Sequence, residues 1–289
     1  MELRLILGVV VVLLIVSLLL QQFRKPYDLP KIVWTHWDSE NPPETVVKTI
    51  DRMRKMLPDW QVNFITTDQI LSSMNQEEIP AGFQTLRVEH QADWIRLKLL
   101  QQYGGCWIDS GIILNQSINT LYRDCVSSRA DLLIFKILGT QTNPTYPIAE
   151  NWFIMAPPQS PMITVWLEEY ERAIKLGFKR YKDRLKEEGV DLQNLMKRSE
   201  DVYLTQHGCY QKVIQQRMPP TAWGSQNQSA RIVYHTADDT MFKIHAQLCK
   251  WDKPCIWKTL NDVDYCRTIP YIKLRGGDRK NVNILPLLE

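Results

Sequence analysis

The sequence has 289 residues, of which 44% are apolar and 23% are charged. This length and composition fit one large globular domain or two small ones and exclude a chain that is disordered throughout. A formal net charge of +3 without a dense basic segment argues against nucleic-acid binding and is compatible with an anionic small-molecule substrate.

The first feature along the chain is an apolar run from Leu5 to Leu20, interrupted only by Gly8 and Ser17. About 16 residues of helix rise roughly 24 Å, which is short for an average bilayer and sufficient for a thin one. A cleaved signal peptide is the alternative, but no small-residue cleavage motif follows the run. We therefore predict a short cytoplasmic tail and a transmembrane signal-anchor over residues 1–22, followed by a stem over residues 23–30.

Two sets of signals oppose each other on the orientation of this anchor. Arg24 and Lys25 outnumber the basic residues before the run, which favours a cytoplasmic C-terminal domain. Six cysteines without a Cys-x-x-Cys pair, and glycosylation sequons at Asn115 and Asn227, favour an oxidising compartment with disulfides. We expect a single-pass type II protein of the Golgi or endoplasmic reticulum, with residues 31–289 as a lumenal domain.

The segment after the stem predicts the start of a parallel α/β sheet. Residues 31–37 are β-branched and aromatic, which is typical of a buried strand. Residues 42–57 carry apolar side chains at helical spacing, and residues 60–66 read as a second strand. A strand, a helix and a strand in this order predict parallel pairing.

The most regular helical pattern covers residues 85–103 and ends at Gly104 and Gly105, which suit a helix C-terminus. A nearly continuous apolar strand, residues 106–114, follows it and contains one acid, Asp109. The remaining pattern predicts three more strands, at residues 131–138, 151–156 and 231–236. It also predicts one long helix over residues 161–188, whose later part carries a solvated charged face.

Asp93 and Arg96 are three residues apart on the predicted helix, so both project from one face. They can form a surface ion pair, worth roughly a few tenths of a kcal/mol. Alternatively they meet Asp109 at the carboxyl edge of the sheet, where open α/β sheets bind their ligands. The pattern alone leaves both interpretations open.

Residues 90–114, HQADWIRLKLLQQYGGCWIDSGIIL, resemble a block shared by three groups of sugar transferases. These are the capsular-polysaccharide-synthesis type, the Och-one-like mannosyltransferases and the glucosylating clostridial toxins. Their common pattern is an Asp-x-x-Arg helix, a Tyr-Gly-Gly turn and an apolar strand that ends in an acid. Residues 30–46 resemble their opening strand, and residues 150–170 resemble a later strand, turn and helix. The chain resembles the capsular-polysaccharide-synthesis group most, because the acid there is often followed by small residues.

The resemblance implies a GT-A-type, Rossmann-like nucleotide-sugar-binding domain behind the transmembrane helix. It implies transfer of a sugar, a hexose in our interpretation, with retention from a UDP- or GDP-sugar to a glycan or glycolipid. By the same resemblance Trp37 stacks on the nucleobase, and Asp93 and Arg96 bind the donor. Asp93 and Asp109 are the expected catalytic residues, and Asp109 is the expected metal ligand.

Gly111 stands where the Och-one-like enzymes and the toxins have a second metal-binding acid. Mn²⁺ or Mg²⁺, the expected cofactor, prefers oxygen ligands and can take several from phosphates and water. Ser110, a water or a C-terminal histidine such as His235 are the candidates to replace the absent acid. The same departure motivates a second hypothesis, a catalytically inactive, membrane-anchored nucleotide- or glycan-binding protein of this fold.

Lys273 is a further candidate for donor binding. It lies in residues 269–281, which we expect to form a flexible loop that closes over the pyrophosphate with a hinge at Gly276 and Gly277. A solvated basic tail is the alternative.

Other aromatic and histidine residues are weaker candidates. Trp34 is the alternative to Trp37 as the stacking aromatic, and Trp107 is expected to pack in the core. His207 and His235 could approach the metal or the phosphates, although core or surface histidine is the more common role.

Overall fold

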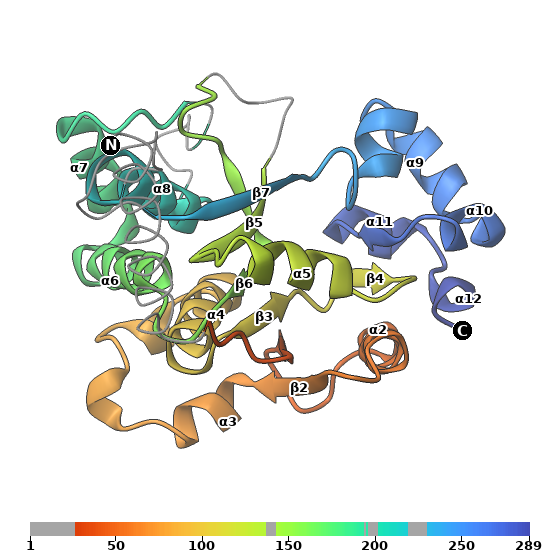
Figure 1. Ribbon diagram of the computed structural model, residues 1–289, viewed down its shortest axis with the longest axis horizontal. Coiled ribbons are helices and arrows are strands. Elements are labelled where there is room, and N and C mark those ends of the chain that lie inside the picture. The colour runs from red at the N-terminus through yellow and green to blue at the C-terminus, as the bar shows by residue number, and fades with distance from the viewer. Residues whose placement is uncertain (1–26, 137–142, 194, 196–201, 219–229) are drawn as a thin grey trace, which may run out of the picture.

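A mixed sheet of six strands forms the centre of the structure, a computed structural model that describes residues 27–136, 143–193, 195, 202–218 and 230–289 (Figure 1). The strands lie in the order β2-β1-β3-β6-β5-β7, and a separate pair, β4 and β8, lies beside them. The strands are β1 (Ile32–Trp37), β2 (Gln61–Thr66), β3 (Gly105–Ile108), β4 (Ile112–Leu114), β5 (Leu132–Lys136), β6 (Ala149–Ala156), β7 (Ile232–Thr236) and β8 (Tyr271–Lys273).

The helices pack around this sheet and beside the β4–β8 pair. They are α2 (Glu44–Met56), α3 (Thr67–Ser72), α4 (Val88–Tyr103), α5 (Asn119–Ser127), α6 (Pro161–Leu176), α7 (Phe178–Glu187), α8 (Thr205–Lys212), α9 (Lys253–Leu260), α10 (Val263–Arg267), α11 (Gly276–Asn281) and α12 (Leu285–Leu288). Short 3₁₀ or π turns are η1 (Gln76–Glu78), η2 (Phe83–Thr85), η3 (Val213–Arg217) and η4 (Lys243–Leu248).

The α/β fold class is confirmed, and the predicted parallel pairing holds for part of the sheet. β1 pairs in parallel with both β2 and β3. β6 then runs antiparallel to β3 and β5, and β5 pairs in parallel with β7. The sheet is therefore mixed, because β6 inserts against the direction of its neighbours.

Alternation along β3 divides the core into two layers. Trp107 packs with α4 and α6 on one side of the sheet, in a cluster that contains Trp94 and Trp166. Cys106 and Ile108 point to the other side, where α2 and α5 cover the sheet. Burial on both faces explains why this strand is apolar throughout.

The turn between α4 and β3 requires its two glycines. Gly104 and Gly105 have φ angles of +64° and +95°, a region that side-chain-bearing residues rarely adopt. A Cβ on Gly104 would lie 2.4 Å from the backbone nitrogen of Pro158, and one on Gly105 would lie 2.5 Å from the carbonyl oxygen of Ile32. The glycines thus let β3 lie against β1 directly after the helix ends.

The predicted strand over residues 106–114 is wrong, because the segment forms two strands in different sheets. β3 ends at Ile108, and Asp109 starts a turn in which Ile112 N donates to the Asp109 carbonyl at 3.0 Å. β4 then pairs antiparallel with β8, with Ile112 opposite Lys273. Asp109 consequently lies where the chain leaves the main sheet.

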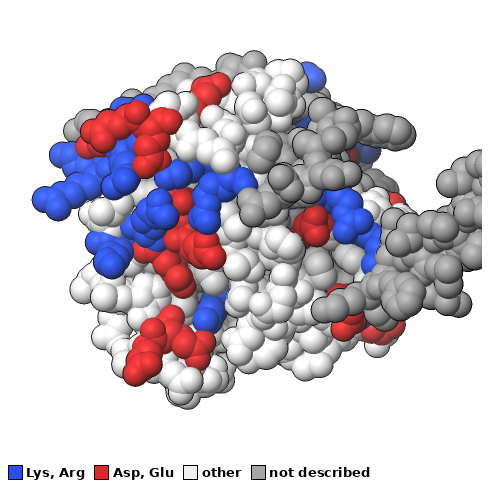
Figure 2. Space-filling view, turned by 60° about the vertical axis from the view of Figure 1, so that its left-hand side comes forward, with Lys and Arg blue, Asp and Glu red and all other residues white. Residues whose placement is uncertain are grey.

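The long helix predicted over residues 161–188 is also divided. Gly177, with φ of +81°, separates α6 from α7. The charged face predicted for the later part is solvent-exposed and carries ion pairs such as Arg184 to Glu188 at 2.7 Å. Figure 2 shows acidic and basic side chains interspersed on the side of the molecule where α6 and α7 lie.

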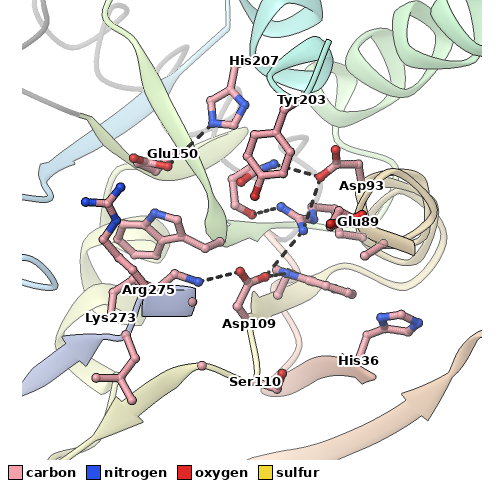
Figure 3. A pocket seen from close by; sticks show the side chains of 18 of the residues that line it. His36, Glu89, Asp93, Asp109, Ser110, Glu150, Tyr203, His207, Lys273 and Arg275 are labelled. Atoms are coloured by element: carbon pink, nitrogen blue, oxygen red, sulfur yellow. Dashed lines mark hydrogen bonds and ion pairs between the residues drawn. The ribbon is translucent and has the colours of Figure 1, made fainter. Parts of the chain in front are cut away.

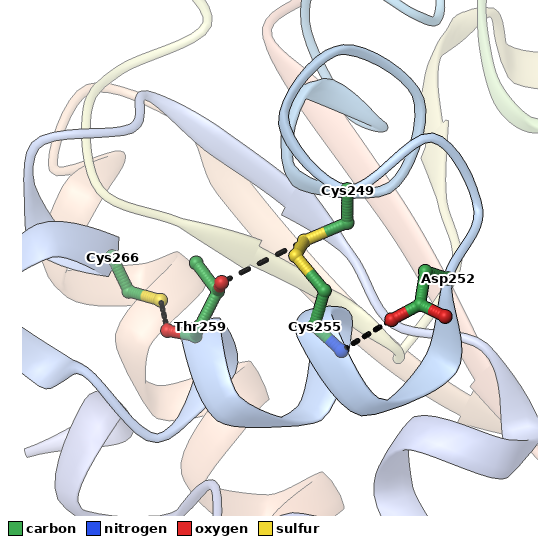
Figure 4. Close-up of a disulfide and its surroundings, with 5 residues drawn as sticks. All are labelled: Cys249, Asp252, Cys255, Thr259 and Cys266. Atoms are coloured by element: carbon green, nitrogen blue, oxygen red, sulfur yellow. Dashed lines mark hydrogen bonds between the residues drawn. A yellow bond between two sulfur atoms is a disulfide. The ribbon is translucent and has the colours of Figure 1, made fainter.

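The C-terminal third, which is drawn in blue in Figure 1, forms a small apolar layer beside β4. Its core contains Ile113 from β4 together with Ile272, Leu274 and Leu260. One disulfide joins Cys249 to Cys255 in this region (Figure 4). Expected disulfide formation is thus confirmed for one pair, and the four remaining cysteines, Cys106, Cys125, Cys209 and Cys266, are free and buried.

Within the described residues, no helix is both long enough and apolar enough to cross a bilayer. The anchor expected over residues 5–20 lies outside the described residues.

Candidate functional site

A cavity of ≈ 730 Å³ lies at the edge of the sheet where β1 and β3 end (Figure 3). Its walls come from the ends of these two strands, one face of α4, the start of β6, the segment leading into α8, and the β8–α11 segment. Asp93, Arg96, Asp109, Trp37, His207 and Lys273 all line it, so residues far apart in the sequence meet in one site.

Asp109 lies at the centre of the charged contacts. Its Oδ1 accepts a hydrogen bond from Trp107 Nε1 at 2.8 Å, and its Oδ2 accepts one from Lys273 Nζ at 2.7 Å. Burial raises the pKa of the Asp109 carboxyl, but the charges of Lys273 and Arg96 outweigh burial and hold this pKa below its ordinary value. Asp109 is therefore a carboxylate at neutral pH.

Arg96 is fixed by several neighbours at once. Its Nη1 donates to the Asn151 carbonyl at 2.7 Å, while Nη2 lies 3.4 Å from Asp93 Oδ1 and 3.6 Å from Asp109 Oδ1. The guanidinium also lies 5.1 Å from the Trp107 ring centroid. Asp93 and Arg96 are only 6% and 5% exposed, so the alternative of a surface ion pair is wrong.

A polar network behind the cavity holds Asp93 in place. Asn151 Nδ2 donates to Asp93 Oδ1 at 3.0 Å and to Gln206 Oε1 at 2.6 Å. Gln206 Nε2 donates in turn to the Asp93 carbonyl at 2.5 Å, and Tyr170 Oη lies 3.4 Å from Asp93 Oδ2. Asn151, Gln206 and Tyr170 lie on three different elements, β6, α8 and α6, so no local sequence pattern predicts that they meet at Asp93.

Of the two candidate stacking aromatics, only Trp37 lines the cavity. Trp34 points elsewhere: its Nε1 donates to the Gly104 carbonyl at 2.9 Å, and its ring lies 5.5 Å from that of Tyr103. Trp107, expected to be core, is buried but also forms part of the cavity wall.

His36, which sequence reasoning did not single out, lies beside Trp37 in the cavity wall. Its Nε2 is 3.0 Å from Thr67 Oγ1. Burial, followed by the charge of Arg96, lowers the pKa of His36 to about 4. The imidazole is therefore neutral at physiological pH and hydrogen-bonds without adding charge.

Lys273 lies in a strand rather than in the flexible loop that the sequence predicted. β8 pairs with β4, and Gly276 and Gly277, expected to form a hinge, begin α11. The expectation failed because β8 is only three residues long and its partner is remote in sequence.

The two histidine candidates separate in the structure. His207 lines the cavity, and its Nε2 lies 3.7 Å from Glu150 Oε2. His235 lies on β7, outside the cavity wall, with Nε2 3.4 Å from Asp124 Oδ2. The structure therefore does not place His235 with Asp109 as a metal ligand.

The sequon at Asn115 is engaged inside the protein. Its Nδ2 donates to the carbonyls of Cys266 and Ile269 at 2.8 and 2.6 Å, and its Oδ1 accepts from Arg52. A glycan on Nδ2 would replace one of its two N–H groups and so remove at least one of these hydrogen bonds, which argues against glycosylation of Asn115 in the folded protein. Asn227 lies outside the described residues.

The β8–α11 segment also brings Arg275 and Arg279 to the cavity. A Cβ built on Gly111 would lie 2.5 Å from Arg279 Nη1, so the space beside the absent second acid is occupied by a guanidinium. Sequence reasoning missed both arginines because it assigned the segment to a loop. Their spacing of four residues would have placed them on one face of a helix.

These residues do not fit the expected Mn²⁺ or Mg²⁺. Both oxygens of Asp109 already accept hydrogen bonds, one of them from the Lys273 ammonium. Gly111 offers no side-chain oxygen. Across the part of the chain that the structure describes, no group of three His, Cys, Asp or Glu side chains converges to hold a metal ion.

The family model for capsular polysaccharide synthesis proteins matches residues 19–173, more than half of the 289 residues. The chain belongs to this family. The resemblance to capsular-polysaccharide-synthesis-like glycosyltransferases is thereby confirmed. The matched residues include Trp37, Asp93, Arg96 and Asp109, whereas Lys273 and the rest of the C-terminal segment lie beyond them.

Proteins related to this member of the capsular polysaccharide synthesis family carry the name glycosyltransferase. "O-glycosyltransferase PaGT" of Phomopsis amygdali is 30% identical over 159 residues, which are 50% of this chain and 35% of that protein. "O-glycosyltransferase braB" of Annulohypoxylon truncatum is 25% identical over 165 residues, 52% of this chain and 39% of that one. The match therefore spans well under half of the length of these relatives.

Among solved structures, "PaToxG Glycosyltransferase" superposes with a TM-score of 0.44 at 14% identity, over 90% of this chain and 84% of that chain.

Proposed function

We propose that the chain is a glycosyltransferase of the GT-A type that transfers a hexose, with retention, from a UDP- or GDP-sugar to a hydroxyl group of a glycan or glycolipid. One observation carries the proposal. The buried Asp93–Arg96 pair and the Asp109 carboxylate meet in one cavity, and all three residues belong to the segment that the family model matches. The names of the relatives support an oxygen atom as acceptor.

The cavity has the size and polarity that a nucleotide-sugar needs. Its volume of ≈ 730 Å³ lies within the usual range for small-molecule sites. We assign Trp37, which lines the cavity, to the nucleobase. We assign Arg96 to the donor hydroxyls, because Asn151 and Trp107 hold its guanidinium in one orientation. A guanidinium fixed in this way loses little freedom when it binds a ligand.

The chemistry is a substitution at the anomeric carbon. The bond between that carbon and the diphosphate oxygen breaks, and its electron pair leaves with the nucleoside diphosphate. The acceptor oxygen forms the new bond and gives its proton to solvent. Cationic groups at the diphosphate stabilise the charge of the leaving group, which is the principal electrostatic requirement of the step. We assign the orientation of the hydroxyls of the transferred sugar to Asp93 and Asp109, which both line the cavity beside Arg96.

We place the domain in the lumen of the Golgi or endoplasmic reticulum, anchored by residues 5–20. The Cys249–Cys255 disulfide supports an oxidising compartment.

The test is a donor panel with the 289-residue chain in detergent. UDP- and GDP-sugars are supplied one at a time, with and without Mn²⁺, and released nucleotide is measured. The proposal predicts turnover of at least one donor. Nucleotide binding without any release would favour the catalytically inactive binding protein that Gly111 motivates. If no donor in the panel shows either binding or release of nucleotide, the proposal that this chain uses a UDP- or GDP-sugar is contradicted.

A further inference from the structure

The place of the absent second acid is occupied by positive charge. Beside Asp109 lies the Lys273 ammonium, and beside Gly111 lies the Arg279 guanidinium. We propose that Lys273 and Arg279 bind the donor diphosphate in place of a divalent cation, an inference that rests on the function proposed above. The consequence is nucleotide binding that does not depend on a metal.

Lys273 is held in this position by backbone and side-chain contacts. β8 pairs with β4 so that Lys273 lies opposite Ile112, and Lys273 N donates to the Met241 carbonyl at 2.9 Å. Its side chain is 13% exposed, and Nζ lies 2.7 Å from Asp109 Oδ2 and 5.9 Å from the Trp152 ring centroid. A divalent ion on Asp109 would have to displace this ammonium or lie directly against a like charge.

Arg279 is free to meet a ligand. It is exposed, lines the cavity, and makes no ion pair with a carboxylate among the described residues. The missing side chain at Gly111 gives its guanidinium room, since even a Cβ there would lie 2.5 Å from Nη1. A guanidinium presents a planar fork of donors that matches two phosphate oxygens.

The helix that carries Arg279 is anchored by a buried carboxylate. Asp278 Oδ2 lies 2.9 Å from His245 Nε2 and accepts a hydrogen bond from Arg275 N at 2.8 Å. Trp257 Nε1 donates to the other oxygen at 3.3 Å. Asp278 is 5% exposed and His245 is fully buried, so α11 is fixed to the C-terminal layer. This segment is therefore folded onto the C-terminal layer, while its basic side chains Arg275, Arg279 and Lys280 stay exposed to solvent.

Cationic side chains carried by an anchored strand and an anchored helix can stabilise a diphosphate as a bound metal does. The leaving group carries several negative charges, and preorganised donors in a partly buried site stabilise it without reorganising. Asp109 then acts as the counter-ion that keeps Lys273 in the wall when no donor is bound. It need not act as a metal ligand.

Isothermal titration calorimetry of UDP and GDP against the 289-residue chain tests the inference. Each nucleotide is titrated once with EDTA and once with Mn²⁺. We expect at least one of them to bind in EDTA, with a Kd that Mn²⁺ changes by less than about threefold. Arg279→Ala should weaken this binding by roughly tenfold or more, because one charge-assisted contact is lost. Lys280→Ala, on the same helix and also exposed, is the matched control and should bind like the wild type.

The outcomes separate the inference from the function beneath it. Binding that requires Mn²⁺ overturns the inference and leaves the proposed donor intact. Binding in EDTA that Arg279→Ala does not weaken beyond Lys280→Ala also overturns it. No binding of either nucleotide in either condition overturns both. Thermal unfolding midpoints of the two variants, expected to match the wild type, exclude a folding defect as the cause of a weakened Kd.

Discussion

Lys273 Nζ lies 2.7 Å from Asp109 Oδ2, although the two residues are 164 positions apart in the sequence. This contact connects the family-matched segment to the C-terminal layer beyond it. The cavity is complete only when both parts are folded together, because Lys273, Arg275 and Arg279 supply one of its walls. A fragment restricted to the matched residues should therefore lack the cationic wall.

Replacing Arg96 by lysine tests the orientation of the guanidinium. Arg96→Lys keeps the charge but loses the fork that reaches the Asn151 carbonyl, Asp93 and Asp109. We expect kcat/KM for the donor to fall by roughly 30-fold, equivalent to about 2 kcal/mol. Steady-state kinetics measure the effect, and Arg54→Lys, an exposed residue of α2, is the control. Unchanged kcat/KM in Arg96→Lys would show that charge alone is needed.

Introducing an acid at position 111 tests whether the site is an incomplete metal motif. Gly111→Asp would place a carboxylate against Arg279, which lies 2.5 Å from the position of the new Cβ. We expect the new ion pair to withdraw Arg279 from the ligand and to weaken UDP or GDP binding in EDTA. If Gly111→Asp instead gains binding and activity that depend on Mn²⁺, the site is an incomplete metal site that lacks only the carboxylate at position 111.

The sequence predicted those parts of the fold that local patterns determine. α2 and α4 follow from helical spacing between clear start and stop signals, and β1 and β2 follow from runs of β-branched and aromatic residues. The Asp93–Arg96 pair followed from its spacing on α4. These features depend on neighbours in the sequence.

The remainder depends on contacts that no local pattern encodes. Residues 105–114 divide into β3 and β4 because β8, far along the chain, pairs with Ile112 and its neighbours. The same remote pairing turns the expected loop around Lys273 into a strand and delivers Arg279 to Gly111. The Asn151–Gln206 network was missed for the same reason, since its members meet only in the folded protein.

The neutral His36 predicts a dependence of stability on pH. Its pKa is lowered from 6.5 to about 4 in the folded protein, so the unfolded chain binds more protons between these values. The free energy of unfolding should therefore fall as the pH drops from 6.5 towards 4, by up to about 3 kcal/mol from this residue.

His36→Gln removes this titration while keeping a hydrogen-bonding group near Thr67. Urea unfolding of both proteins across this pH range measures the difference. The stability gap should change in favour of the variant as the pH falls, and parallel pH profiles would show that His36 does not titrate as described.

Asp109→Asn tests the central claim that this cavity transfers a sugar. The substitution keeps the shape of the side chain but removes its charge, leaving Lys273 and Arg96 without their shared counter-ion. Sugar transfer from the donor that the wild-type chain uses should fall by roughly a hundredfold or more. Binding of the nucleoside diphosphate should persist or tighten, because a negative charge beside the diphosphate has been removed.

The decisive measurement is the rate of donor turnover by the wild type and Asp109→Asn, with nucleotide affinity measured on the same two proteins. Loss of turnover with retained nucleotide affinity is the predicted result. Equal turnover in the two proteins, or no turnover in the wild type with any UDP- or GDP-sugar, would contradict the proposed function.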